Sequence, residues 1–270
     1  MVVLTFTYFV IFFSLIYVSR CTGLHIKNRR RNRNVYIRRR LRCCGKHTAE
    51  KLYDWVMRMN SFPAFWGRML SGENRISEDE IGFLREKNCK VALIFNDLTE
   101  LGVSGIDGTG DALRAVEAVK DLGVPQNEGI AVFADIRDDW SVNHNWMISF
   151  AHTLSENGYV PGFIGNTDSS ANFNFDRQCS HFVQATEGAG QYGAVYWATE
   201  PKAGGEPENW TPFCPSALNP EDIGLWRCGQ IGLGDIQANA TYARDASLLD
   251  YMWNPEITER IEENNDENAI

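Results

Sequence analysis

The sequence contains only five histidines, and it has neither a Cys-x-x-Cys pair nor a His-Glu-x-x-His segment. Structural zinc sites depend on such closely spaced Cys and His ligands. No predicted strand leads into a Gly-x-Gly-x-x-Gly turn, the usual nucleotide-binding device of an open doubly wound sheet. The sequence therefore predicts no metal and no cofactor.

Acidic residues are absent from the first 46 positions, which hold eleven of the 26 basic residues. The other 224 residues carry 15 basic and 35 acidic side chains, so a basic leader joins an acidic body near Lys46. Nucleic acids require a dense Lys and Arg surface, and we expect the body not to bind them. Residues 24–47 are predicted to be a disordered basic arm, with a nucleic-acid or anionic-lipid patch as the alternative.

Charged residues are also absent from positions 2–18, where only Thr5, Thr7 and Ser14 interrupt apolar and aromatic side chains. This run is just short of the roughly 20 residues that span a bilayer, so residues 1–23 are either a signal peptide or a short membrane anchor. We expect a protein that is secreted or anchored through its N-terminus, with membrane contact through residues 2–18 and the arm. The alternative is an anchor that leaves the body facing the cytoplasm.

Two sequons and the cysteines bear on this choice. Asn209 and Asn239 begin Asn-x-Thr triplets and would accept glycans only in the secretory lumen. Of the seven cysteines, Cys214 and Cys228 flank a Pro-containing loop and are expected to form a disulfide. Cys89 begins an apolar run and is expected to be buried.

From position 47 onward, short β-prone runs alternate with amphipathic segments, a pattern typical of βα units around a parallel sheet. Strands are predicted at residues 62–67, 90–96, 130–136, 160–165, 194–199, 223–231 and 235–238. Helices are predicted at residues 50–59, 111–122 and 246–253, between Ser77 and Asn88, and between Ser141 and Gly158.

Seven strands are one fewer than a (β/α)8 barrel requires. Residues 48–255 are therefore predicted to form an α/β, TIM-barrel-like domain that lacks its first strand or improvises it from residues 34–37. An open doubly wound sheet is the competing architecture. Residues 256–270 are expected to form a frayed acidic tail.

Carboxylates follow several of the predicted strands, where barrel enzymes place catalytic groups. The candidate catalytic residues are Asp97, Asp135, Glu200 and Asp235. Structural alternatives are a loop cap for Asp97, a solvated side chain for Glu200, a turn for Asp235 and a salt bridge for Asp135. Aromatic residues near strand ends could stack on sugars or simply pack in the core; they are Trp66, Trp140, Trp197 and Tyr196.

Several of these segments resemble one known family. They are LYDW at 52–55, FPAFWGR at 62–68, DA at 111–112 with LGVP at 122–125, AVFADI at 131–136 and YWA at 196–198. They resemble the glycoside hydrolase-like TIM-barrel family of unknown function, which is related to muramidase-type lysozyme barrels. The resemblance implies a (β/α)8 fold and a carbohydrate, such as a cell-wall or surface glycan, as substrate or ligand.

The sequence departs from this family at two points. The family's opening strand usually carries Gly-x-Asp, which has no counterpart ahead of Leu52, and its Asp-Ile-Glu pattern reads Asp135-Ile136-Arg137 here. Because residues i and i+2 of a strand point the same way, Arg137 is expected to face Asp135 and contact the substrate. Glycoside hydrolysis needs a second carboxyl, so turnover is expected to be slow or absent while binding survives.

The sequence thus predicts a glycoside hydrolase-like protein that cleaves O-glycosyl bonds if it is active. The alternatives are a carbohydrate-binding barrel without turnover and a truncated gene product without activity.

Overall fold

The computed structural model describes residues 31–32, 34–36, 46–58, 61–187, 192–202, 204, 207–233 and 236–256. The expected signal peptide or anchor, most of the basic arm, Asp235 and the acidic tail beyond residue 256 lie outside these described residues. Within the described part of the chain, no helix has the length and apolar character needed to cross a membrane.

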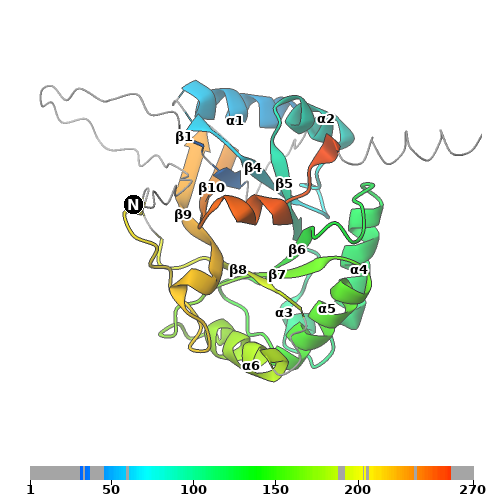
Figure 1. The fold of residues 1–270 in the computed structure, drawn as a ribbon, viewed down its shortest axis with the longest axis vertical. Coiled ribbons are helices and arrows are strands. Elements are labelled where there is room, and N and C mark those ends of the chain that lie inside the picture. The colour runs from blue at the N-terminus through cyan, green and yellow to red at the C-terminus, as the bar shows by residue number, and fades with distance from the viewer. Residues whose placement is uncertain are drawn as a thin grey trace, which may run out of the picture.

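The fold is α/β, with one curled and mostly parallel sheet surrounded by helices (Figure 1). Six parallel pairings join seven neighbouring strands, which are β2 (Asn34–Tyr36), β4 (Phe65–Met69), β5 (Lys90–Phe95), β6 (Ala131–Asp135), β7 (Val160–Gly165), β8 (Val195–Ala198) and β9 (Ile223–Leu233). Strand β10 (Ile236–Ala243) pairs antiparallel with both β9 and β2 and closes the sheet. Strands β1 (Arg31–Asn32) and β3 (Ser61–Phe62) form a separate parallel pair.

The strand predictions agree closely with the structure for β5 to β9, whereas β4 begins three residues later than predicted and β10 extends five residues further. Residues 34–37 were predicted as a possible improvised first strand. They contain strand β2, which pairs with Trp66 and Gly67 of β4. Part of the arm predicted to be disordered is therefore β1 and β2. The expected alternation of strand and helix stops at β9, because β9 and β10 form an antiparallel hairpin.

The helices are α1 (Lys46–Arg58), α2 (Glu78–Glu86), α3 (Glu100–Val103), α4 (Thr109–Lys120), α5 (His144–Glu156) and α6 (Phe175–Glu187). Ser77 caps α2 as predicted, since its hydroxyl accepts from the Glu80 N–H. The cap of α5 is Asn143 rather than Ser141. The final helix is the 3-10 helix η2 (Ala246–Tyr251), and neither α3 nor α6 was predicted.

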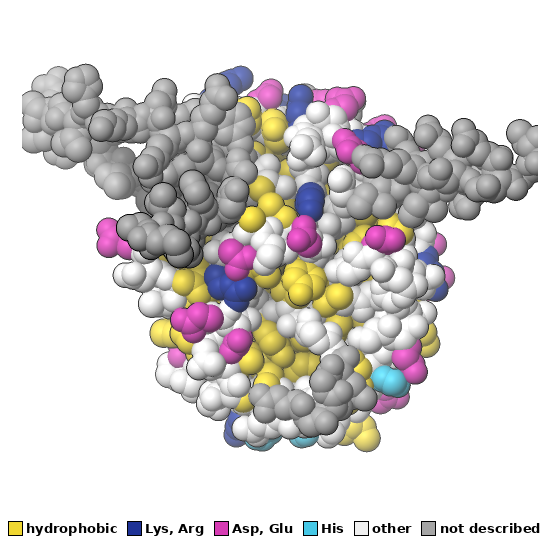
Figure 2. Space-filling view, viewed as in Figure 1, with side chains coloured by type: hydrophobic (Ala, Val, Ile, Leu, Met, Phe, Trp, Pro, Cys, Tyr) yellow, Lys and Arg dark blue, Asp and Glu magenta, His cyan; other side chains and the backbone are white. Residues whose placement is uncertain are grey.

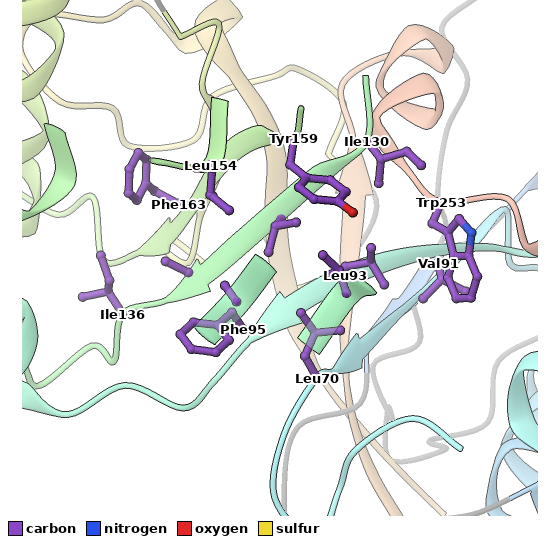
Figure 3. Close-up of a cluster of buried hydrophobic side chains, with 14 of the residues drawn as sticks. Leu70, Val91, Leu93, Phe95, Ile130, Ile136, Leu154, Tyr159, Phe163 and Trp253 are labelled. Carbon is purple, nitrogen blue, oxygen red and sulfur yellow. The ribbon is translucent and has the colours of Figure 1, made fainter. Parts of the chain in front are cut away.

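The core has two layers because strand side chains alternate between the two faces of the sheet. Inside the barrel, the Trp197 ring packs edge-on against Phe133 at 5.5 Å and Phe65 at 6.3 Å between centroids. Outside it, Leu93, Phe95 and Phe163 pack beneath the helices (Figure 3).

Helix η2 lies across the amino ends of the strands (Figure 1). Its Leu248 and the following Met252 join the inner core, and Lys90 Nζ donates to the Leu249 carbonyl at 2.8 Å. Acidic, basic and apolar side chains are interspersed over the described residues on this face (Figure 2). The carboxyl ends of the strands lie at the opposite edge, where α/β barrels carry their sites.

Candidate functional site

A pocket of about 460 Å³ lies at the carboxyl ends of β4, β5 and β6. Its lining combines three carboxylates, two amides, a guanidinium, a thioether and an indole. These residues are Met69, Asn74, Asn96, Asp135, Arg137, Asp138, Asp139 and Trp140. The volume is in the range of small-molecule sites, which run from about 300 to 1,000 Å³.

Asp135 is the last residue of β6 and is only 8% exposed. Of the three predicted catalytic carboxylates that lie among the described residues, it is the one found in the lining of this pocket. Burying a carboxylate at a strand end is costly unless it has partners or lines a solvated site, and Asp135 lines the pocket.

Arg137 lies in the same pocket but does not continue the strand. Because β6 ends at Asp135, the alternation that was expected to place Arg137 against Asp135 does not extend to it. The Arg137 side chain is exposed, and its guanidinium lies over the Trp140 ring, 4.9 Å from the centroid. This cation–π contact makes Arg137 and Trp140 one wall of the pocket.

Asp138 connects the pocket to the end of β8 and to a residue within β9. Its Oδ1 accepts a hydrogen bond from Thr199 Oγ1 at 2.9 Å, and its Oδ2 lies 3.4 Å from Arg227 Nη2. The same Nη2 lies 4.0 Å from Glu200 Oε1. Arg227 is 5% exposed, so a buried guanidinium on β9 holds carboxylates that follow β6 and β8.

Asn96 is held by Ser71, which lies in the loop after β4. Its Oδ1 accepts from the Ser71 N–H at 3.1 Å and from the Ser71 hydroxyl at 2.9 Å. Its Nδ2 donates to the Ser71 carbonyl at 3.2 Å. Three hydrogen bonds therefore fix the Asn96 side chain in the pocket wall.

Two of the remaining predicted acids, Asp97 and Glu200, lie elsewhere. Asp97 is exposed and pairs with Arg114 of α4, with its Oδ2 3.1 Å from Arg114 Nε, so it is a surface ion pair outside the lining. The Glu200 side chain is 24% exposed and lies beside Arg227 and Lys202 rather than in the lining. Asp235 lies outside the described residues.

Three of the four aromatic candidates belong to the core, so for these three the structure favours core packing over the alternative of stacking on a sugar. Trp66 is fully buried beside the Tyr53 ring, and Tyr196 is also in the outer layer. Trp197 fills the barrel interior. Trp140 alone among them reaches the pocket, because it follows a strand instead of lying within one.

The features that favoured the secretory pathway give a mixed result. Asn209 is exposed, but Asn239 is 1% exposed on β10, where a glycan could not be accommodated. Cys214 is a free thiol that contacts the Leu218 carbonyl at 3.5 Å, so the expected disulfide is not formed; the Cys228 side chain lies outside the described residues. Cys89 is buried, as predicted.

Sequence reasoning missed the residues that complete the site, which are Met69, Asn74, Asn96, Asp138, Asp139, Thr199 and Arg227. A signal was available for three of them. Asp138 and Asp139 come three and four residues after Asp135, in the segment that follows an apolar strand. Arg227 could have been noticed as a charged residue inside the predicted strand at residues 223–231. Among the described residues, no group of His, Cys, Asp or Glu side chains could hold a metal ion.

No protein-family model matches the chain, and a search of curated proteins gave no match. Among solved structures, the chain is similar to an uncharacterized protein of B. stearothermophilus, with 25% sequence identity and a TM-score of 0.67. That match covers 82% of this chain and 99% of the other. A Tat-secreted protein of Mycobacterium tuberculosis matches at 11% identity with a TM-score of 0.49, over 78% of this chain and 95% of that one.

Proposed function

We propose that the barrel domain is a glycoside hydrolase-like domain that binds a glycan in the pocket at the carboxyl ends of β4, β5 and β6. The observation that carries the proposal is the combination of buried Asp135 with Trp140 in one pocket. Sugars present hydroxyl groups to carboxylates and amides, and they present C–H faces to aromatic rings.

The fold supports this proposal at the level of architecture. We interpret the sheet as a derivative of the (β/α)8 barrel in which the β9–β10 hairpin replaces the final βα units. Short strand β2 completes the circle between β10 and β4. Both the position of the pocket and the family resemblance fit this interpretation.

Hydrolysis is the second candidate, and the number of carboxylates favours it. Glycosidases use two carboxyl groups separated by roughly 5 to 9.5 Å. The pocket contains Asp135, Asp138 and Asp139, so the Arg at position 137 does not remove every possible partner of Asp135. Glycan binding without turnover is the simpler function, because it needs no protonated carboxyl.

We also propose that the domain acts outside the cytoplasm, as a secreted or membrane-anchored protein. This proposal rests on the apolar run at residues 2–18 and on exposed Asn209. A glycan on Asn209 of the protein made in a eukaryotic secretory host would support it.

Isothermal titration with cellohexaose, chitohexaose and laminarihexaose tests the binding proposal. Wild-type protein should bind at least one of them, and Asp135→Asn should weaken that binding about tenfold or more, as expected for a charge-assisted hydrogen bond. Trp140→Ala should also weaken it.

Asp97→Asn is the matched control, because Asp97 also follows a strand but lies outside the pocket, and it should bind like wild type. Failure of wild-type protein to bind any of the three, or equal losses in Asp135→Asn and Asp97→Asn, would contradict the proposal.

A further inference from the structure

The side chain of Asn96 has a defined orientation in the pocket wall because main-chain groups of Ser71 contact both ends of its amide. The Ser71 N–H can only donate, so it must face Oδ1, and the Ser71 carbonyl can only accept, so it must face Nδ2. The two ends of the amide are therefore distinguished by their partners rather than by an arbitrary choice.

These contacts determine what Asn96 can offer a ligand. Its Oδ1 already accepts two hydrogen bonds, one from the Ser71 N–H and one from the Ser71 hydroxyl, which occupy its two lone pairs. Its Nδ2 has two N–H groups, and the Ser71 carbonyl takes one of them. The capacity that remains is one N–H donor, on a side chain that lines the pocket.

We infer that Asn96 is a specificity-determining residue, whose remaining N–H binds a neutral acceptor oxygen of the ligand, and that Ser71 is its positioning residue. The acceptor is a hydroxyl, ring or carbonyl oxygen of an uncharged sugar. This inference rests on the proposed glycan-binding function. It adds that, in one hydrogen bond, Asn96 is the donor and the glycan is the acceptor.

The same geometry argues against a cation as the ligand of this pocket. Three Asp residues beside two Asn residues resemble the oxygen-rich surroundings that Ca²⁺ prefers, in which Asn contributes its carbonyl oxygen. Here the Asn96 carbonyl oxygen is occupied by Ser71, so a cation at this wall would meet an N–H group instead. An anion is disfavoured by the three carboxylates.

A double-mutant cycle tests the inference, with the tightest-binding of the three hexasaccharides as the probe. Asn96→Ala should weaken binding about 3- to 10-fold, the range of one hydrogen bond. Ser71→Ala should weaken it about twofold on the same grounds, because the amide loses one of its three restraints. In an Asn96→Ala background, Ser71→Ala should have no further effect, since it acts only through the amide.

Two additional variants sharpen the result. Asn96→Asp keeps an acceptor for the Ser71 donors but replaces the N–H with oxygen, so it should weaken binding at least as much as Asn96→Ala. Ser104→Ala is the control for Ser71→Ala, because the Ser104 hydroxyl also bonds a carbonyl, that of Leu101, outside the pocket. Circular dichroism establishes that each variant is folded.

The outcomes separate this inference from the proposed function. If wild-type protein binds a hexasaccharide and Asn96→Ala binds it equally well, the inference is wrong and the proposed function stands. If the two single-variant effects add in the double variant, the role of Ser71 is wrong. If no hexasaccharide binds wild-type protein, both fail. A calorimetric titration with Ca²⁺ should show no binding, and Ca²⁺ binding that Asn96→Ala abolishes would overturn the inference in favour of a cation site.

Discussion

Arg68 of β4 and Glu80 of α2 form an ion pair that is buried between the sheet and the helix. Arg68 Nη2 donates to Glu80 Oε2 at 2.9 Å. Arg68 Nε lies 2.7 Å from Oε1, though without the alignment of a hydrogen bond. Each side chain is only 2% exposed. The pair therefore links α2 to β4, next to the loop that contains Ser71.

Glu80→Gln should destabilise the protein by about 3 to 5 kcal/mol, because it leaves the Arg68 charge buried without its counter-charge. Chemical denaturation measures this change in the free energy of unfolding. The double variant Arg68→Met/Glu80→Leu should recover most of the loss. Arg114→Met, which breaks the exposed pair with Asp97, is the control and should cost less than about 1 kcal/mol. A cost for Glu80→Gln as small as that of the control would show that the pair is not buried in solution.

Arg137→Glu should raise hydrolysis of a bound hexasaccharide, because it adds a protonatable carboxyl to the pocket that contains Asp135. General acid catalysis contributes 10²- to 10⁴-fold, and we expect a gain of about 10²-fold, at the lower end of this range, since the side chain at position 137 is exposed. Mass spectrometry of the released sugars measures the rate. Arg137→Gln is the control, because it removes the positive charge without adding an acid. Equal rates in the two variants would assign any gain to loss of the charge.

Gly165→Ala should destabilise the protein by about 1 to 3 kcal/mol, because the new methyl group would overlap the Phe175 ring of α6. Thermal unfolding measures the effect. The control is Gly110→Ala in α4, where nothing lies within 4 Å of the added carbon. That variant should be neutral or more stable, since Ala loses less backbone entropy than Gly in a helix. If Gly110→Ala destabilises the protein and Gly165→Ala does not, the close contact between Gly165 and Phe175 is wrong.

Cys214 should react with iodoacetamide faster than Cys89 or Cys179 in the native protein. Burial raises the pKa of the Cys89 and Cys179 thiols, which suppresses the reactive thiolate at neutral pH. Burial also raises the pKa of Cys214, with contributions from Asp222 and Glu221, but its side chain is partly accessible. Peptide mapping after a short pulse at pH 8 measures the order. Labelling of Cys214 only after reduction would reinstate the disulfide expected from the sequence.

Strands β5 to β8 could be predicted from the sequence because each is a short apolar run between turns, and burial on both faces of a parallel strand leaves that pattern. Helix α6 was not predicted, although its buried residues Phe175, Cys179 and Phe182 recur at the spacing of an amphipathic helix and were available as a signal. The predicted strand at residues 130–136 continued to Ile136, one residue past the end of β6 at Asp135, so the strand alternation was extended to Arg137. The direction of Arg137 therefore required the structure.

The site was only partly predictable for a related reason. Asp135 could be found because strand-end position depends on local sequence alone. Asn96, Thr199 and Arg227 have roles that depend on partners 25 to 89 positions away, namely Ser71 for Asn96 and Asp138 for the other two. Contacts over such separations arise from the way the strands assemble into the sheet, and one sequence does not encode them in any local pattern.

Helix η2 and Met252 limit the ways in which a polymeric ligand could bind to this barrel. With Leu248 and Met252 packed into the amino end, and Phe133 and Trp197 filling the middle, the described barrel has no passage along its axis. A long chain cannot thread through it. It must either lie across the rim or insert one end, and any released fragment must leave by the mouth through which it entered. Comparing the affinity for a hexasaccharide with that for the corresponding polymer would distinguish a rim that accommodates the interior of a chain from a pocket that accepts only its end.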